Sequence, residues 1–132
     1  MRLSEAGLLG NMAVDRCEGK LIHGDSACFL GGALLAIGAV KLGLLSTQEE
    51  LKAYEVLKQQ WPILETQVAE HQIPFASCAA RRVMQIIWEL NDQRRWTRPQ
   101  IAAWVATIEP RDTPPVSPAI HEVAAEMQGV YR

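Results

Sequence analysis

Apolar residues recur three or four positions apart along most of the chain, and nowhere do Val, Ile or Thr alternate with polar residues over the length of a strand. The first spacing lines up side chains on one face of a helix, whereas alternation would line them up on one face of a strand. The pattern predicts an all-α fold, a compact single domain of five to six helices around a central apolar helix rich in Ala and Gly. We expect residues 1–109 to form this helical core domain, and residues 110–132 to form a proline-rich arm and a short C-terminal helix.

The central helix is predicted in the segment from Ala27 to Val40, where nearly every side chain is apolar or absent. Asp25 or Ser26 is placed to cap its first turn, and the helix is expected to continue to Gly43. Its internal glycines lower the helix propensity, but a residue without Cβ lets a neighbouring helix backbone approach closely. We therefore interpret three glycines as contact points between helices: Gly31, Gly32 and Gly38.

Capping patterns mark the starts of other helices. Ser-Thr-Gln-Glu at 46–49 and Thr-Arg-Pro-Gln at 97–100 are capping boxes, in which the first and fourth side chains satisfy each other's backbone amides. A weaker first helix is expected over 4–19, capped by its first residue, and another helix over 76–90. The apolar stripe that follows the first box continues across Pro62, which predicts one kinked helix or two nearly continuous ones.

Two of these helices carry apolar stripes that are expected to face the core. In the helix after the first capping box, the stripe consists of Leu51, Tyr54, Leu57, Trp61, Leu64 and Val68. In the helix over 76–90, it consists of Cys78, Val83, Ile86, Ile87 and Leu90, with Met84 and Trp88 on the flank.

Charge and composition restrict the class of function. The 132 residues include 13 Lys and Arg and 15 Asp and Glu, and the net charge of -2 gives no electrostatic reason to bind nucleic acid. The apolar run over 27–45 contains Lys41 and four glycines, which argues for a core helix and against a membrane span. The first residues carry Glu5 and Asp15 and lack the apolar core of a signal peptide, so we expect a cytoplasmic location. The three cysteines are then expected to be reduced, and no metal or cofactor is predicted.

One short segment combines reactive side chains with the start of the central helix. Cys17, His23, Asp25 and Cys28 include every residue type needed for a metal site or for a thiol nucleophile with a base. Their spacing lacks the close pairs of a structural zinc site, so we interpret them as structural thiols, a turn histidine and a capping aspartate. A small thiol- or metal-dependent enzyme centred on these four residues is the alternative.

The loop over 91–97, with the sequence NDQRRWT, is the predicted binding surface together with the proline-rich arm. Arg94, Arg95 and Trp96 are of the types that dominate binding energy at interfaces, and capped helices on both sides would hold the loop rigidly. Asn91 and Asp92 are candidate ligand-binding residues of the same loop. The competing interpretation is that Asn91 and Asp92 end a helix and that Trp96 folds back over the core.

Three segments resemble a family of small bacterial and phage proteins of unknown function. They are Cys-Glu-Gly at 17–19, Cys-Phe-Leu-Gly-Gly-Ala-Leu at 28–34, and Trp-Glu-Leu-Asn-Asp at 88–92 followed by Thr97. The resemblance implies a compact helical fold and no particular activity. We expect a small protein-binding module rather than an enzyme, of an accessory or inhibitor type, encoded by a phage or mobile element and acting on a host or bacterial protein. A homodimer joined through the tryptophan-bearing surface is a further hypothesis.

Overall fold

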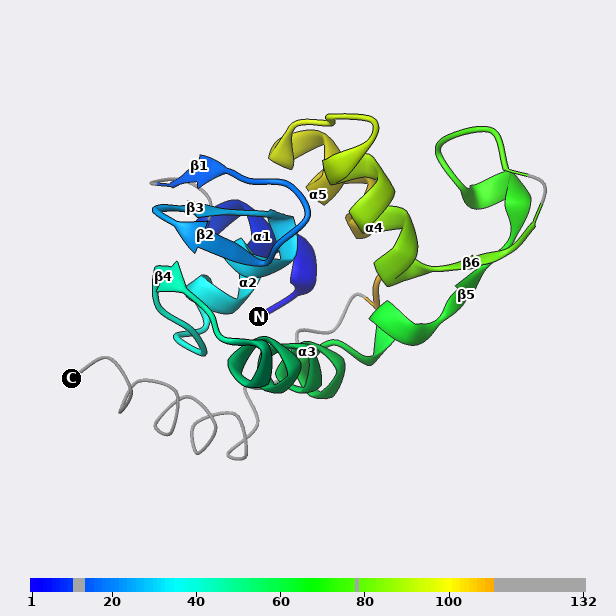
Figure 1. Ribbon diagram of the computed structural model, residues 1–132. Helices are drawn as coiled ribbons and strands as arrows, with labels where there is room; N and C mark the ends of the chain where they lie inside the picture. Colours follow the sequence, from blue (N-terminus) through cyan, green and yellow to red (C-terminus); the bar gives the residue numbers. More distant parts are fainter. Residues whose placement is uncertain (11–13, 78, 111–132) are drawn as a thin grey trace.

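The computed structural model describes residues 1–10, 14–77 and 79–110, and it corrects the all-α prediction. In these residues the fold is mixed: five α-helices are joined by a small four-stranded sheet and a two-stranded sheet (Figure 1). The helices are α1 (Leu3–Gly10), α2 (Phe29–Ala36), α3 (Thr47–Gln60), α4 (Val83–Asp92) and α5 (Arg98–Ile108). Each strand has only two or three residues, too few for an alternating pattern to show in the sequence.

The four-stranded sheet has the order β1-β3-β2-β4, with β1 and β3 parallel and the other pairs antiparallel. Its strands are β1 (Asp15–Arg16), β2 (Ile22–Gly24), β3 (Ser26–Ala27) and β4 (Gly43–Leu44). The sheet replaces parts of two predicted helices. The first helix ends at Gly10, and the central helix begins only at Phe29, so Cys28 caps it in place of Asp25 or Ser26. It ends at Ala36, because Gly38 has a φ of 73°, a left-handed conformation that breaks the helix.

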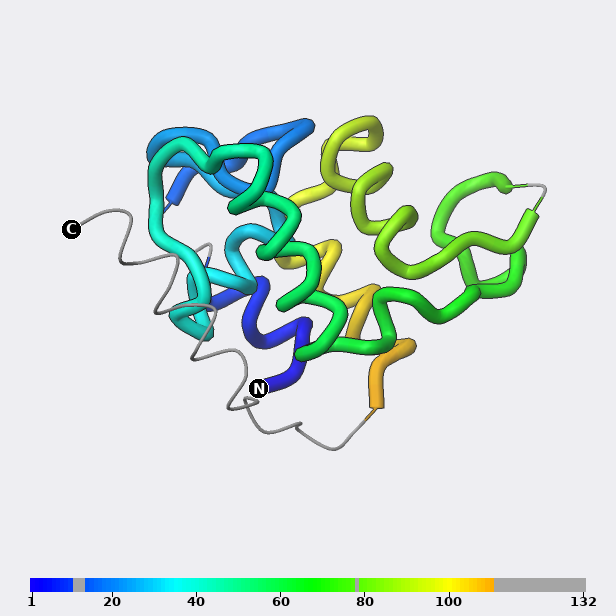
Figure 2. Tube along the Cα trace, turned by 60° about the horizontal axis from the view of Figure 1, so that its bottom comes forward, coloured from blue at the N-terminus to red at the C-terminus, as the bar shows by residue number. Residues whose placement is uncertain are grey.

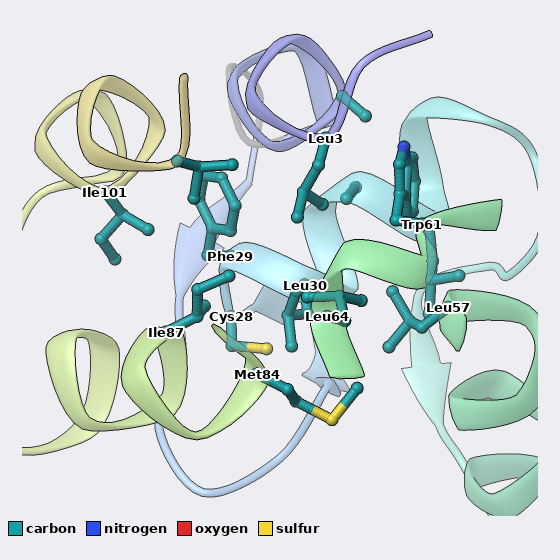
Figure 3. Packing of buried hydrophobic residues seen from close by; sticks show 14 of the residues in the cluster. Leu3, Cys28, Phe29, Leu30, Leu57, Trp61, Leu64, Met84, Ile87 and Ile101 are labelled. Atoms are coloured by element: carbon teal, nitrogen blue, oxygen red, sulfur yellow. The ribbon is translucent and has the colours of Figure 1, made fainter. Parts of the chain in front are cut away.

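The core is built around α2, as the sequence predicts. Phe29 and Leu30 are fully buried, and side chains from all five helices meet around them (Figure 3). Two of the predicted glycine contacts exist: a Cβ on Gly31 would collide with the carbonyl of Leu21, and a Cβ on Gly10 would collide with the carbonyl of Gly32. For Gly38 the contact interpretation is wrong, because a Cβ at this position would meet open space and the role of the glycine is the left-handed turn.

The capping boxes are confirmed, and the stripe of α3 only in part. Ser46 and Glu49 cap α3, and Thr97 and Gln100 cap α5. After α3 the chain continues as a short 3-10 helix, Pro62–Glu65, so the element divides at the proline. The stripe is buried from Leu57 onward, at Leu57, Trp61, Leu64 and Val68. Leu51 and Tyr54, by contrast, are exposed and half-buried respectively.

The helix predicted over 76–90 begins later, at Val83, because Arg81 and Arg82 form β6 and pair with β5 (Gln67–Val68). With the 3-10 turn Glu70–Gln72, these strands form an arm that extends from one side of the body (Figures 1 and 2). Cys78 lies outside the described residues, as do residues 111–132 of the predicted proline-rich arm and C-terminal helix.

Glu109, at the end of α5, connects this helix to the start of α1. Its carboxylate accepts hydrogen bonds from the backbone amide and the hydroxyl of Ser4 and forms an ion pair of 3.0 Å with Arg2. Ser4 therefore lies inside the first turn of α1, and the capping acceptor is Glu109, 105 residues later in the chain, rather than Ser4 itself. None of the described helices is long and apolar enough to cross a membrane.

Candidate functional site

A groove of about 560 Å³ lies between α3 and α4. We call it the α3–α4 groove. Its apolar lining consists of Leu51, Tyr54, Leu64, Met84 and Trp88. The lining also includes charged and amide side chains: Gln48, Lys52, Glu55, Lys58, Glu65, Arg82 and Gln85. Large apolar side chains together with polar ones are the composition expected of a surface that binds another molecule.

Three of the lining side chains are large and are not fully buried in the core. Leu51 is 63% exposed and Trp88 is 36% exposed, although both are large and apolar. Tyr54 contacts Trp88 edge to face, with ring centroids 5.8 Å apart and an interplanar angle of 87°. The sequence analysis missed this site, because Leu51 and Tyr54 belong to the stripe of α3 that was predicted to face the core.

A second hollow, of about 260 Å³, adjoins the groove and shares Tyr54 and Trp88 with it. Its other lining residues are Gly19, Lys20, Cys28 and Asp92, and we call it the Asp92 hollow. Burial, and then the nearby carboxylates of Glu50 and Asp92, raise the pKa of Tyr54 to about 12. The phenol is protonated at neutral pH, as an ordinary tyrosine is, and the raised pKa keeps its hydrogen-bond donor further into the alkaline range.

Asn91 holds the elements around this hollow together. Its side chain is almost wholly buried, and its Nδ2 donates to the carbonyl oxygen of Cys17 at 3.0 Å and to Oδ1 of Asp92 at 2.8 Å. Its Oδ1 accepts from the backbone amide of Phe29 at 3.4 Å. The guanidinium of Arg16 donates to the backbone carbonyl of Asn91. The three segments that carry the family resemblance, 17–19, 28–34 and 88–92, thus meet at this one residue.

The two described cysteines lie close to this junction. The Sγ of Cys28 accepts from the backbone amide of Gly31 at 3.4 Å, and burial raises the pKa of its thiol to about 12. Cys17 donates its thiol proton to the carbonyl oxygen of Lys20 at 3.3 Å, and burial raises its pKa as well. A reactive cysteine needs a lowered pKa, because the thiolate is the nucleophile. Both thiols are therefore in environments that suppress this chemistry.

His23 and Asp25 are not grouped with the buried thiol. His23 is exposed on β2, and Asp25 is exposed in the turn between β2 and β3, whereas Cys28 is buried at the start of α2. Within the residues that the structure describes, no three His, Cys, Asp or Glu side chains come close enough to hold a metal ion.

In the predicted binding loop, Arg94 and Arg95 are exposed, and each also contacts another part of the protein. The guanidinium of Arg94 lies 4.7 Å from the ring centroid of Phe75 and forms an ion pair of 3.3 Å with Glu89. Arg95 has a φ of 51° and lies 3.7 Å from the carboxylate of Glu18. The structure places Trp96 half-buried against the core. Of the five predicted binding residues, Asp92 lines a hollow and Asn91 positions it, whereas the other three do not line the groove.

In comparisons with known proteins, the chain matches no family model, no curated protein and no solved structure.

Proposed function

We propose that this chain is a cytoplasmic protein-binding module that holds an amphipathic helix of a partner protein in the α3–α4 groove. The observation that carries the proposal is the exposure of Leu51 and Trp88, which line the same groove of about 560 Å³ as Tyr54. Amphipathic helices bind such grooves by placing side chains from one face against the apolar floor. A host or bacterial protein as the partner fits the size and composition of the chain and its resemblance to small bacterial and phage proteins.

The lining also has the composition of an interface centre. Trp and Tyr are over-represented among the residues that dominate binding energy, and here they line the groove together with the buried Leu64 and Met84. On the rim, Lys58 and Glu65 pair at 3.6 Å, and Lys52, Glu55 and Arg82 carry further charges of both signs. Charges at a rim orient a partner and set its specificity more than they add affinity.

The enzyme alternative is less well supported by the same structure. It requires an activated thiol or a metal cluster, whereas burial raises the pKa of Cys17 and Cys28, and His23 and Asp25 are exposed away from Cys28. We therefore propose binding rather than catalysis.

The test is selection of peptides from a random library displayed on phage, with the full chain immobilised. Enriched peptides are synthesised, and their Kd is measured by fluorescence polarisation against wild type, Leu51→Ser and Trp88→Ala. Leu44→Ser is the matched control, since Leu44 on β4 is 67% exposed but does not line the groove. We expect about tenfold or greater loss of affinity for Leu51→Ser and Trp88→Ala and none for Leu44→Ser.

Three outcomes would overturn the proposal. The first is failure to enrich any peptide, and the second is enrichment of peptides that bind Leu51→Ser and Trp88→Ala as tightly as wild type. The third is a homodimer in sedimentation analysis that Leu51→Ser dissociates, because a second copy of the chain would then be the occupant of the groove.

A further inference from the structure

We propose that the Asp92 hollow binds a basic side chain, Arg or Lys, carried by the partner segment that lies in the α3–α4 groove. The inference rests on the proposed function for its setting, because the hollow adjoins the groove through Tyr54 and Trp88. It adds the chemistry of the anchor that such a segment needs.

The charge in the hollow favours a cation. Asp92 is the last residue of α4, where the negative end of the helix dipole adds to the charge of its carboxylate. Its Oδ1 is held by the amide of Asn91 at 2.8 Å, which fixes the direction of the carboxylate. Among the described residues, no Lys or Arg forms an ion pair with Asp92. The carboxylate therefore has capacity for a cation from outside.

The remaining wall suits the stem of a basic side chain. The rings of Tyr54 and Trp88 line the hollow, and aromatic rings attract an ammonium or guanidinium placed over their faces. The methylene groups of Arg and Lys also pack well against apolar surface while the charged end reaches a polar partner. A volume of about 260 Å³ is small for a cofactor and suits a single side chain.

An anion is a poor fit, although the hollow lies at the start of α2. The first amides of that helix are already used: Phe29 donates to Asn91 and Gly31 donates to the sulfur of Cys28. Any anion placed there would also face Asp92. Lys20 is the one cation in the described lining, and it is exposed at the edge of the hollow. Its charge opposes a bound cation, so removing it is expected to strengthen binding.

The probe is N-acetyl-arginine methylamide, whose only charge is the guanidinium, and the control probe is the citrulline analogue, which has nearly the same shape and no charge. Binding is followed by the NMR signal of the Trp88 indole N–H, assigned with Trp88→Phe. We expect the arginine probe to shift this signal saturably and the citrulline probe not to shift it. Asp92→Asn removes an attractive charge and is expected to lower the affinity for the arginine probe about fivefold or more. Lys20→Gln removes a repulsive charge and is expected to raise this affinity.

Asp92→Asn is chosen because its side-chain oxygen still accepts from Asn91. If this variant nevertheless fails to fold, Lys20→Gln carries the test alone. Equal shifts from both probes, or an affinity for the arginine probe that neither variant changes, would overturn the inference.

The probe is a single residue and does not need the groove. The anchor is therefore tested apart from peptide binding, and either proposal can fail while the other stands. If the selected peptides bind the groove without any basic residue, the proposed function survives and the anchor is refuted.

Discussion

The amide of Asn91 donates a 3.0 Å hydrogen bond to the carbonyl oxygen of Cys17, which lies 74 residues earlier in the chain. The same side chain accepts from the amide of Phe29, so the end of α4, the start of α2 and the end of β1 are connected by one buried group. Asp92 and Cys28, which line the Asp92 hollow, are sequence neighbours of Asn91 and Phe29 in this junction, and the junction connects α4 to the core.

Replacing Asn91 by Ala is therefore expected to lower the free energy of unfolding by about 2–3 kcal/mol, because the amide of Phe29 and the carbonyl of Cys17 lose their buried partner. Urea unfolding followed by circular dichroism measures the change. Gln93→Ala is the control. Gln93 lies two residues after Asn91 and is exposed, so the loss of its side chain is expected to cost about 0.5 kcal/mol or less. A cost for Asn91→Ala no larger than for Gln93→Ala would show that the junction does not stabilise the fold.

The second prediction concerns the close contact between Gly31 of α2 and the backbone of Leu21. Gly31→Ala places a Cβ against the carbonyl of Leu21, and the forced backbone shift is expected to cost about 1–3 kcal/mol. Gly24→Ala is the comparison, because Gly24 has open space around it and only its φ of 61° is unfavourable for Ala. Thermal unfolding of both variants distinguishes a steric collision from a conformational cost. A smaller loss of stability at Gly31 than at Gly24 would contradict the packing described for α2.

The predictions from sequence succeeded where the determinants are local. The capping boxes of α3 and α5 depend on residues three positions apart, and the apolar segment around Phe29 has no polar side chain that would allow it to face water. The strands were not predicted, because each has only two or three residues and pairs with a partner elsewhere in the chain. The predicted burial of Leu51 was wrong for a related reason. Periodicity defines one face of α3, but it does not show whether another element covers that face.

The candidate site was predicted only in fragments. Asn91 and Asp92 were singled out because Asn and Asp often end helices or bind ligands. Cys28 was singled out as a thiol at the start of the predicted central helix. Their meeting at the Asp92 hollow depends on contacts between distant segments, which no local pattern encodes. Tyr54 and Trp88 gave no signal of function, since aromatic residues at helical spacing are typical of a core.

The ion pair between Arg2 and Glu109 is expected to matter more than the ion pairs on the surface. The side chain of Glu109 is almost wholly buried and also accepts from Ser4, so Glu109→Gln leaves the partners with a weaker acceptor. We expect a loss of about 2–3 kcal/mol of unfolding free energy, since breaking one side of a buried pair is costly. Glu65→Gln, which breaks the exposed pair with Lys58, is expected to cost about 0.5 kcal/mol or less. Equal costs in urea unfolding would show that Glu109 does not anchor α1.

The buried thiol of Cys28 makes stability depend on pH in the alkaline range. In the unfolded chain this thiol loses its proton near its ordinary pKa of 9.0, whereas in the folded protein burial raises the pKa to about 12. Between these values the unfolded state binds fewer protons than the folded state, so the free energy of unfolding falls as the pH rises. Tyr54 acts in the same direction, but only above its ordinary pKa of 10.0.

Urea unfolding of wild type and of Cys28→Ala at about pH 8 and about pH 10 tests this dependence. Wild type should lose stability between the two pH values, and Cys28→Ala should lose less, because it lacks only the thiol of Cys28. Comparing the two pH values within each variant cancels the cost of removing the side chain itself. An equal loss in both proteins would mean that Cys28 titrates as an ordinary exposed thiol, and the enzyme alternative would then regain support.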